Sequence, residues 1–83
     1  MTLKVLFFST LREAADQQSA MTVDHADANW SVGELLEYLY ERFPKLRAWD
    51  EQILVAVDHD YADRCTPLTD GQEVAVMPPV QGG

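Results

Sequence analysis

Short apolar and polar blocks alternate along the first third of the chain and predict a strand hairpin. Residues 3–9 are apolar on both parities and rich in β-branched and aromatic side chains, which is typical of a central strand covered on both faces. Residues 20–23 resume a strand that can pair back on the first. The polar stretch between them, residues 12–18, predicts a short helical turn.

A helical period follows. Ser31 and Glu34 stand at capping-box spacing, so we expect a helix to begin there and to end at Pro44. Apolar side chains recur on one stripe at intervals of three and four residues: Val32, Leu35, Leu36, Leu39, Tyr40 and Phe43. Residues 45–50 predict a further short turn around Trp49. The opposite helix face favours a solvated surface over a binding site, because it carries Glu34, Glu37, Glu41 and Arg42.

Three more strands are predicted in the second half of the chain. Residues 53–57 form an apolar run that is too short for a helix and β-branched enough for a buried strand. Residues 58–60 predict a turn, and Tyr61 begins a short edge segment that is broken at Pro67. The Asp70-Gly71 pair predicts another turn before a last strand over residues 73–77.

The order of these elements predicts an α+β roll with one main helix packed across a mixed sheet. The first and last strands are the natural central neighbours. If they are parallel, their C-terminal ends lie side by side, so Phe8 and Met77 should be close together. The residues of the other parity are better core candidates: Val5, Phe7, Val74 and Val76.

Length and charge narrow the class of protein. Eighty-three residues make one small domain. Six Lys and Arg against fourteen Asp and Glu give a net charge of −8, so we expect neither nucleic acid nor an anionic membrane as a partner. The longest apolar runs are far shorter than the roughly 20 residues of a membrane span, which favours a soluble, cytoplasmic protein.

Cysteine and histidine offer little chemistry in this sequence. The single cysteine, Cys65, excludes an internal disulfide framework and the paired cysteines of zinc or iron–sulfur sites. We expect it to be a small buried or half-buried side chain rather than a reactive thiol. His25 and His59 stand at no ligand spacing, so no metal site is expected.

The C-terminal segment is the most informative part of the sequence. We expect residues 1–77 to form the domain and residues 78–83 an extended tail, Pro78-Pro79-Val80-Gln81-Gly82-Gly83. Proline favours polyproline II at about 3.1 Å per residue, so the tail can project roughly 18 Å and enter another protein. The two glycines leave only backbone and a terminal carboxylate, which suits a channel too narrow for side chains.

A carboxylate is a poor electrophile until it becomes a mixed anhydride such as an acyl adenylate. The sequence contains neither of the glycine-rich nucleotide-binding motifs, GxxxxGK[ST] or GxGxxG. Activation of the tail must therefore come from a partner enzyme.

Residues 68–83, together with residues 4–8 and Arg12-Glu13, closely resemble the small subunit of molybdopterin synthase, the MoaD family. The resemblance runs over nearly the whole length. Its most specific part is the terminal Pro-Pro-Val-x-Gly-Gly, because a bare Gly-Gly also fits ubiquitin and the thiamine sulfur carrier ThiS. The resemblance implies a ubiquitin-like β-grasp fold, in agreement with the predicted element order.

The resemblance also implies a sulfur carrier. An E1-like enzyme, MoeB in bacteria, would adenylate Gly83 with ATP, and sulfur derived from a cysteine desulfurase would replace AMP to give a thiocarboxylate. The loaded tail would enter the large subunit, MoaE, in a heterotetramer and donate sulfur to cyclic pyranopterin monophosphate for molybdenum cofactor biosynthesis. The chain would thus be the sulfur-donating subunit of a sulfurtransferase, with no active site and no bound cofactor of its own.

Docking should involve more than the tail, because six residues bury little area. We expect a partner interface near the tail exit, formed by Phe8, Arg12, Tyr61 and Met77. The alternative is that Phe8 and Met77 are ordinary core. Many relatives have Asn where this chain has Asp58; an Asx-type turn survives that change, but the added charge can alter partner contacts.

Three other functions stay open. The first is a ubiquitin-like modifier whose Gly83 is joined to lysines of target proteins. The second is a ThiS-like carrier for thiazole synthesis, which the Pro-Pro-Val segment and the chain length make less favoured. The third is a purely structural interaction domain, for which the tail would be irrelevant.

Overall fold

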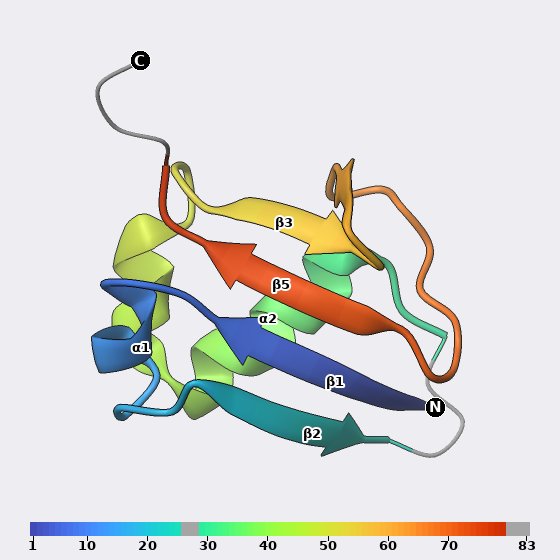
Figure 1. Cartoon of the computed structure of the whole chain (residues 1–83), viewed down its shortest axis with the longest axis horizontal. Coiled ribbons are helices and arrows are strands. Elements are labelled where there is room, and N and C mark those ends of the chain that lie inside the picture. Colours follow the sequence, from blue (N-terminus) through green and yellow to red (C-terminus); the bar gives the residue numbers. More distant parts are fainter. Residues whose placement is uncertain (26–28, 80–83) are drawn as a thin grey trace.

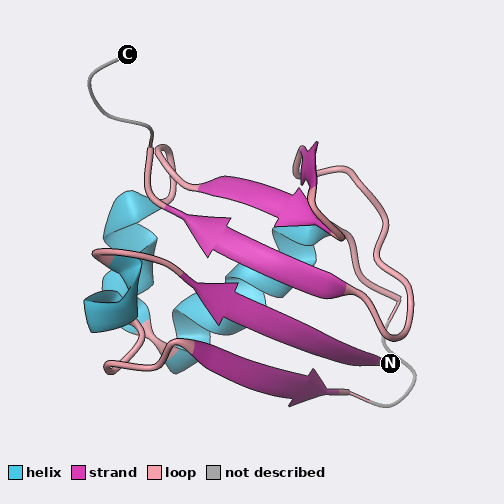
Figure 2. Cartoon of the chain, viewed as in Figure 1, coloured by secondary structure: helices cyan, strands magenta, loops and turns pink. Residues whose placement is uncertain are grey.

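The structure, a computed structural model, describes residues 1–25 and 29–79. Five strands form one mixed sheet in the order β2-β1-β5-β3-β4, and the main helix α2 crosses one of its faces (Figures 1 and 2). The predicted α+β architecture is therefore confirmed. The elements are β1 (Thr2–Phe7), α1 (Leu11–Ala14), β2 (Ala20–Asp24), α2 (Val32–Arg42), the 3₁₀ helix η1 (Pro44–Trp49), β3 (Leu54–Val57), β4 (Asp60–Ala62) and β5 (Glu73–Met77).

The first and last strands are parallel neighbours inside the sheet, as predicted. β1 pairs with β5 in a register that places Phe7 opposite Val76. β2 lies antiparallel on the outer side of β1, and β3 lies antiparallel on the other side of β5. The C-terminal ends of β1 and β5 therefore meet at one edge of the sheet, where the tail leaves the domain (Figure 1).

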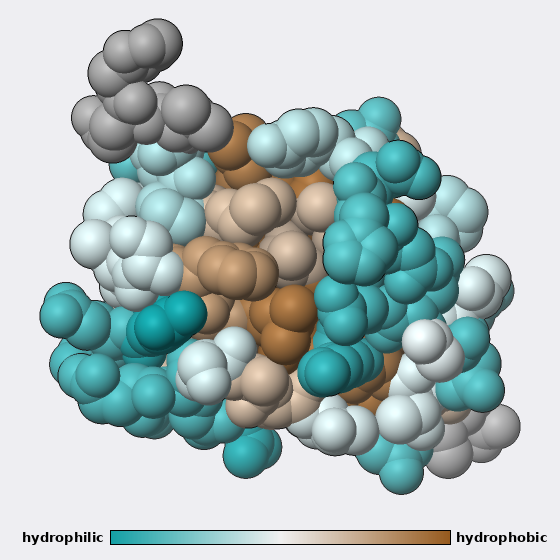
Figure 3. All heavy atoms as spheres, in the orientation of Figure 1, coloured by the Kyte–Doolittle hydropathy of each residue, from teal (hydrophilic) through white to brown (hydrophobic). Residues whose placement is uncertain are grey.

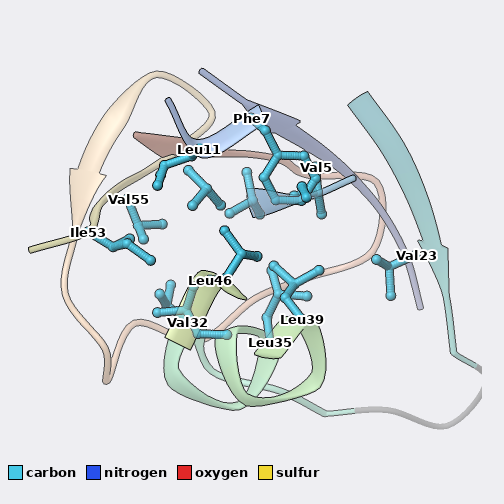
Figure 4. Close-up of a cluster of buried hydrophobic side chains, with 14 of the residues drawn as sticks. Val5, Phe7, Leu11, Val23, Val32, Leu35, Leu39, Leu46, Ile53 and Val55 are labelled. Carbon is cyan, nitrogen blue, oxygen red and sulfur yellow. The ribbon is translucent and has the colours of Figure 1, made fainter. Parts of the chain in front are cut away.

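The hydrophobic core lies between α2 and one face of the sheet (Figure 4). Alternate side chains of β1 and β5 point into it, and each is at most 1% exposed: Val5, Phe7, Val74 and Val76. The Phe7 ring meets the Phe43 ring edge to face at 5.9 Å between centroids. Burial of each side chain of this size contributes about 1.5–3 kcal/mol to folding.

The helix begins and ends where the sequence predicts. Ser31 Oγ accepts a hydrogen bond from the Glu34 backbone N–H at 3.4 Å, and the Glu34 carboxylate accepts one from the Ser31 N–H at 3.1 Å. This reciprocal pair satisfies two amides that the helix leaves without partners. At the other end, Pro44 opens η1, which buries Leu46.

The expectation that residues 3–9 are covered on both faces is wrong. Lys4 is exposed, Leu6 is half-buried and Phe8 is 39% exposed, while their neighbours along β1 are buried. The strand has neighbours on both sides within the sheet, but α2 covers only one of the two faces of that sheet. Its apolar side chains on the other face therefore form surface rather than core.

The expected burial of Cys65 is also wrong, since its side chain is exposed. Cys65 lies in the connection between β4 and β5. The Asp63 carboxylate accepts a hydrogen bond from the Cys65 backbone N–H at 2.9 Å, which makes an Asx turn on the surface.

One polar cluster ties α2 to the connections that follow it. The Tyr40 hydroxyl and the Arg64 guanidinium both donate to Asp50 Oδ1 at 2.6 Å, and Arg64 also donates to the Asp50 backbone carbonyl. The hydrogen bonds from Tyr40 and then from Arg64 hold the pKa of Asp50 below its usual value. Burial, followed by the hydrogen bond to Asp50, raises the pKa of the Tyr40 hydroxyl.

Replacing Tyr40 with Phe should lower the free energy of unfolding by about 1–2 kcal/mol at pH 7, because one hydrogen bond to a charged acceptor is lost. The folded-state pKa of Asp50 lies below its ordinary value of 3.8, so its contribution is present above that pH and is lost as the pH falls through the folded-state pKa. The difference in free energy of unfolding between wild type and Tyr40→Phe should therefore be smaller at pH 3 than at pH 7. Urea unfolding of both proteins at pH 7 and at pH 3 measures this difference. Tyr38→Phe, which removes a hydroxyl outside this cluster, is the control; an equal loss from both variants would contradict the assignment.

Candidate functional site

The sheet face that α2 leaves uncovered carries an apolar hollow of about 320 Å³. We term its lining the open-face patch: Leu6, Phe8, Ala56, His59, Tyr61, Glu73, Ala75 and Met77. Figure 3 shows apolar side chains gathered over the middle of this face, with hydrophilic side chains around them. Phe8 and Tyr61, at 39% and 74% exposed, are the two large apolar side chains of the described residues that stand out into solvent.

Strand register gives the patch its shape. Leu6 pairs with Ala75, Ala75 with Ala56, and Ala56 with Tyr61, so one row of side chains crosses four strands. The two alanines stand side by side in the middle, while Leu6 and Tyr61 stand at the ends of the row. Small side chains flanked by large ones leave a depression. Because backbone hydrogen bonds hold each member, the depression is a rigid feature of the sheet.

The tail begins beside this patch. β5 ends at Met77, and the half-buried Pro78 and Pro79 follow it. The Phe8 N–H donates to the Val76 carbonyl at 3.2 Å. This bond extends the β1–β5 hydrogen-bond ladder almost to Met77, the last residue of β5. Ser9, at φ 56°, then turns the chain away from β5.

The predicted chemical end of the tail lies outside the described residues. This applies to Val80, Gln81, Gly82 and Gly83. The division into a domain over residues 1–77 and a tail over residues 78–83 therefore stays a prediction. The structure fixes the place where the tail starts, which is the edge of the open-face patch.

Three of the four residues predicted for a partner interface line one hollow: Phe8, Tyr61 and Met77. The alternative that Phe8 belongs to the core is excluded by its exposure, and Met77 is half-buried. Arg12 is exposed in α1 and does not line the hollow; its Nε donates to the Phe7 carbonyl at 3.2 Å. Whether these residues bind a partner stays a prediction.

Sequence reasoning missed the other members of the patch. Leu6 and Ala75 share the parity of Phe8 and Met77, and this signal was sufficient to find them. Glu73 shares that parity on β5 as well. Ala56 joins through the pairing of β3 with β5, which periodicity alone does not give. His59, for which no metal or catalytic role was expected, lies at the rim because of the turn that precedes β4.

The turn predicted for residues 58–60 is confirmed at Asp58 and His59, whereas Asp60 already belongs to β4. Asp58 and His59 have φ angles of 48° and 75°, and Val57 pairs with Asp60, as in a two-residue hairpin with a primed turn. Asp58 Oδ1 accepts from the Glu73 N–H at 3.0 Å, and the Asp58 N–H donates to the Glu73 carbonyl at 2.8 Å. An Asn side-chain oxygen can accept the same bond, so the departure from the family pattern leaves this turn intact.

The chemistry of the patch suits protein binding. It holds one imidazole and one carboxylate at its rim and is otherwise apolar, apart from the Tyr61 hydroxyl. Apolar depressions of this kind on a small domain mark interaction surfaces. Within residues 1–25 and 29–79, no group of three or more His, Cys, Asp or Glu side chains is placed to hold a metal ion. In the same residues, no helix has the length and apolar character needed to span a membrane.

Comparison with known proteins gives relatives by sequence and by fold. The chain matches the ThiS family over residues 5–83. It is 36% identical to the molybdopterin synthase sulfur carrier subunit of Mycobacterium tuberculosis, over 98% of this chain and 96% of that protein. Its structure is similar to that of a putative molybdopterin converting factor subunit 1 from Pyrococcus furiosus, with a TM-score of 0.83, 26% identity, and 96% and 99% of the two chains covered.

A second similar structure is SAMP1, small archaeal modifier protein 1, from Haloferax volcanii, with a TM-score of 0.82, 28% identity and full coverage of both chains. These similarities confirm the ubiquitin-like β-grasp fold that the resemblance implied. The near-full-length match to the carrier subunit confirms the resemblance itself. The chain therefore belongs to the ThiS family and groups within it with the molybdopterin synthase sulfur carrier subunits.

Proposed function

We propose that this chain is the sulfur carrier subunit of a molybdopterin synthase. The observation that carries the proposal is its 36% identity, over nearly the full length of both chains, to a protein of that name. The terminal Pro-Pro-Val-Gln-Gly-Gly supports it, because this segment supplies an unhindered carboxylate on a stiff arm. The position of the tail at the edge of an apolar patch supports it further, since arm and patch can engage one partner together.

The chemistry on Gly83 proceeds stepwise. The Gly83 carboxylate attacks ATP on an E1-like, MoeB-like enzyme, which releases pyrophosphate and leaves an acyl adenylate. The outer sulfur of a persulfide formed by a cysteine desulfurase then attacks the carbonyl carbon, and AMP leaves. A thiol of the activating system reduces the resulting acyl disulfide and is itself oxidised to a disulfide. The product is a thiocarboxylate, in which the sulfur atom replaces one carboxylate oxygen.

Transfer takes place in the partner. A thiocarboxylate concentrates negative charge on a polarizable sulfur, and the absence of side chains at Gly82 and Gly83 lets that sulfur approach a carbon atom in a narrow pocket. The acceptor is cyclic pyranopterin monophosphate. The dithiolene formed on it contains two sulfur atoms, so each product molecule requires two rounds of sulfur loading on Gly83. The general acid and base belong to the large subunit, so this chain has no active site and binds no cofactor of its own.

We also propose that a MoaE-like large subunit covers the open-face patch, in a heterotetramer. Burial of Phe8 and Tyr61 removes two exposed rings from water, and such aromatic side chains dominate interface energies. Pro78 and Pro79 would then direct the tail into the pocket of the same subunit. Because activation uses ATP, we place this function in the cytoplasm.

A modifier function is the second candidate, and the likeness to SAMP1 is the observation that favours it. Both functions begin with the same adenylate and differ in the nucleophile that follows. A sulfur nucleophile gives the thiocarboxylate, whereas a lysine amine gives an isopeptide bond. A thiamine-type carrier role differs from our proposal only in the acceptor of the sulfur. The match to the ThiS family is compatible with that role as well.

Coexpression of the chain with an E1-like enzyme and a desulfurase should yield a C-terminal peptide whose mass gain equals the exchange of one oxygen for one sulfur. Deletion of Gly83, or extension of the chain beyond it, should abolish the mass gain and the formation of dithiolene product, with the circular dichroism spectrum unchanged. Gly82→Ala should load sulfur but transfer it more slowly, because a methyl group meets the wall of the channel. Intact-mass analysis and product assay measure these effects.

Undiminished product from a C-terminally extended chain would refute the carrier proposal. Lysine-linked adducts in place of the mass gain would favour the modifier. Full activity of Gly82→Ala would mean that the channel is wider than a glycine backbone requires.

Phe8→Asp should weaken binding to the large subunit by about tenfold or more, because it places a charge in a desolvated apolar contact. Titration calorimetry with the purified large subunit measures the Kd. Gln52→Asp, which introduces the same charge at an exposed position away from the patch, is the matched control. An unchanged Kd for a folded Phe8→Asp variant would remove Phe8 from the interface.

A further inference from the structure

A second groove, on the helix side of the sheet, has no role in the function proposed above. Its volume is about 640 Å³, and it follows α2 from the N-cap Ser31 to Glu41 in the last turn. We term it the aromatic groove, after the three rings that line it together with three carboxylates. The residues that matter here are His25, Trp30, Glu34, Glu37, Tyr38 and Glu41.

The three rings form one mutual cluster. The Trp30 centroid lies 5.0 Å from that of His25 and 5.2 Å from that of Tyr38, and His25 and Tyr38 are 6.2 Å apart. The rings come from three places in the chain: just after β2, just before α2, and within α2. Trp30 and Tyr38 are half-buried against the core, so each is anchored and still keeps a surface toward the groove.

The three glutamates lie on one face of α2, at intervals of three and four residues, and all are exposed. The Glu34 Oε1 atom is engaged by Ser31 in the capping box. Glu37 has a loose ion pair with Arg47 at 3.6 Å. Glu41 makes no ion pair within the described residues. The groove therefore combines aromatic faces with negative charge that local cations do not balance.

We propose that the aromatic groove binds an arginine side chain presented by a basic segment of a partner protein. A planar guanidinium can lie against an aromatic ring and donate to a carboxylate at the same time, which a compact ammonium group does less well. Charge complementarity supports this occupant, because the chain carries a net charge of −8.

The groove and the open-face patch lie on opposite sides of the sheet. Groove residues belong to α2 and the segment before it, on the covered side, whereas Leu6, Phe8, Ala75 and Met77 line the other side. An arginine side chain in the groove therefore leaves the patch exposed. The inference is thus independent of the sulfur carrier function.

Titration of the isotope-labelled full chain with an N-acetylated tetra-arginine amide, followed by ¹H–¹⁵N NMR, tests the proposal. The Trp30 indole N–H and the amides of residues 37–41 should shift with saturation, while the Trp49 indole N–H serves as an internal reference outside the groove. Glu41→Gln should raise the fitted Kd by about two- to fivefold. Glu51→Gln removes the same charge at an exposed position outside the groove and should raise the Kd less.

Tetra-lysine amide should bind more weakly than tetra-arginine amide, and Phe8→Asp should leave the titration unchanged. Equal Kd values for the two peptides, or equal effects of Glu41→Gln and Glu51→Gln, would overturn the proposal in favour of diffuse attraction to an acidic surface. Shifts of the same groove signals on dilution without peptide would overturn it in favour of a second copy of this chain. If one of the other variants fails to fold, Trp30→Leu provides a second test, followed through the amides of residues 37–41. It should raise the Kd for tetra-arginine amide because it removes one aromatic face, and an unchanged Kd would overturn the proposal.

Discussion

Parallel pairing of β1 with β5 is the constraint from which the rest of the molecule follows. It joins the first and last strands of the chain, places Phe7 opposite Val76, and brings their C-terminal ends to one edge of the sheet. That edge is where Phe8 lies beside Met77 and where Pro78 and Pro79 begin. Without this pairing, an apolar patch and a terminal arm would have no reason to be neighbours.

The same two strands divide their side chains between two tasks. One parity fills the core with Val5, Phe7, Val74 and Val76, and the other builds the floor and rim of the open-face patch. A change on the first parity costs stability because it leaves a cavity beneath α2. A change at Phe8 affects a side chain that is already exposed, so stability and binding can vary separately there. Ala75 of β5 pairs with Ala56 of β3, and the small side chains at these two positions deepen the hollow while their backbones complete the sheet.

Local signals were sufficient for much of the fold. The capping box at Ser31, the apolar stripe of α2 and the turn at Asp58 each depend on residues close in sequence, and the structure reproduces all three. Parity along β1 and β5 also gave the correct core. Two expectations failed. Hydrophobicity on both parities of residues 3–9 did not reveal that α2 covers only one face of the sheet. The general preference of cysteine for burial was given more weight than the polar residues around Cys65, which is exposed. Both depend on what packs across a strand or loop, which is a tertiary property.

The candidate site also combines features that depend on tertiary structure with features that the local sequence provides. Phe8, Tyr61 and Met77 converge because the sheet brings three strands together, and the sequence predicted that convergence only in part, since it included Arg12 and omitted Leu6 and Ala75. The reacting group that we propose, the Gly83 carboxylate, needs no such convergence. A carboxylate at the end of a chain requires a free approach and a length of arm, and these are properties of the residues Pro78 to Gly83 rather than of a folded pocket. The folded domain therefore serves mainly to present this arm beside the open-face patch, and the β-grasp fold that does so is shared with proteins only 26–28% identical to this chain.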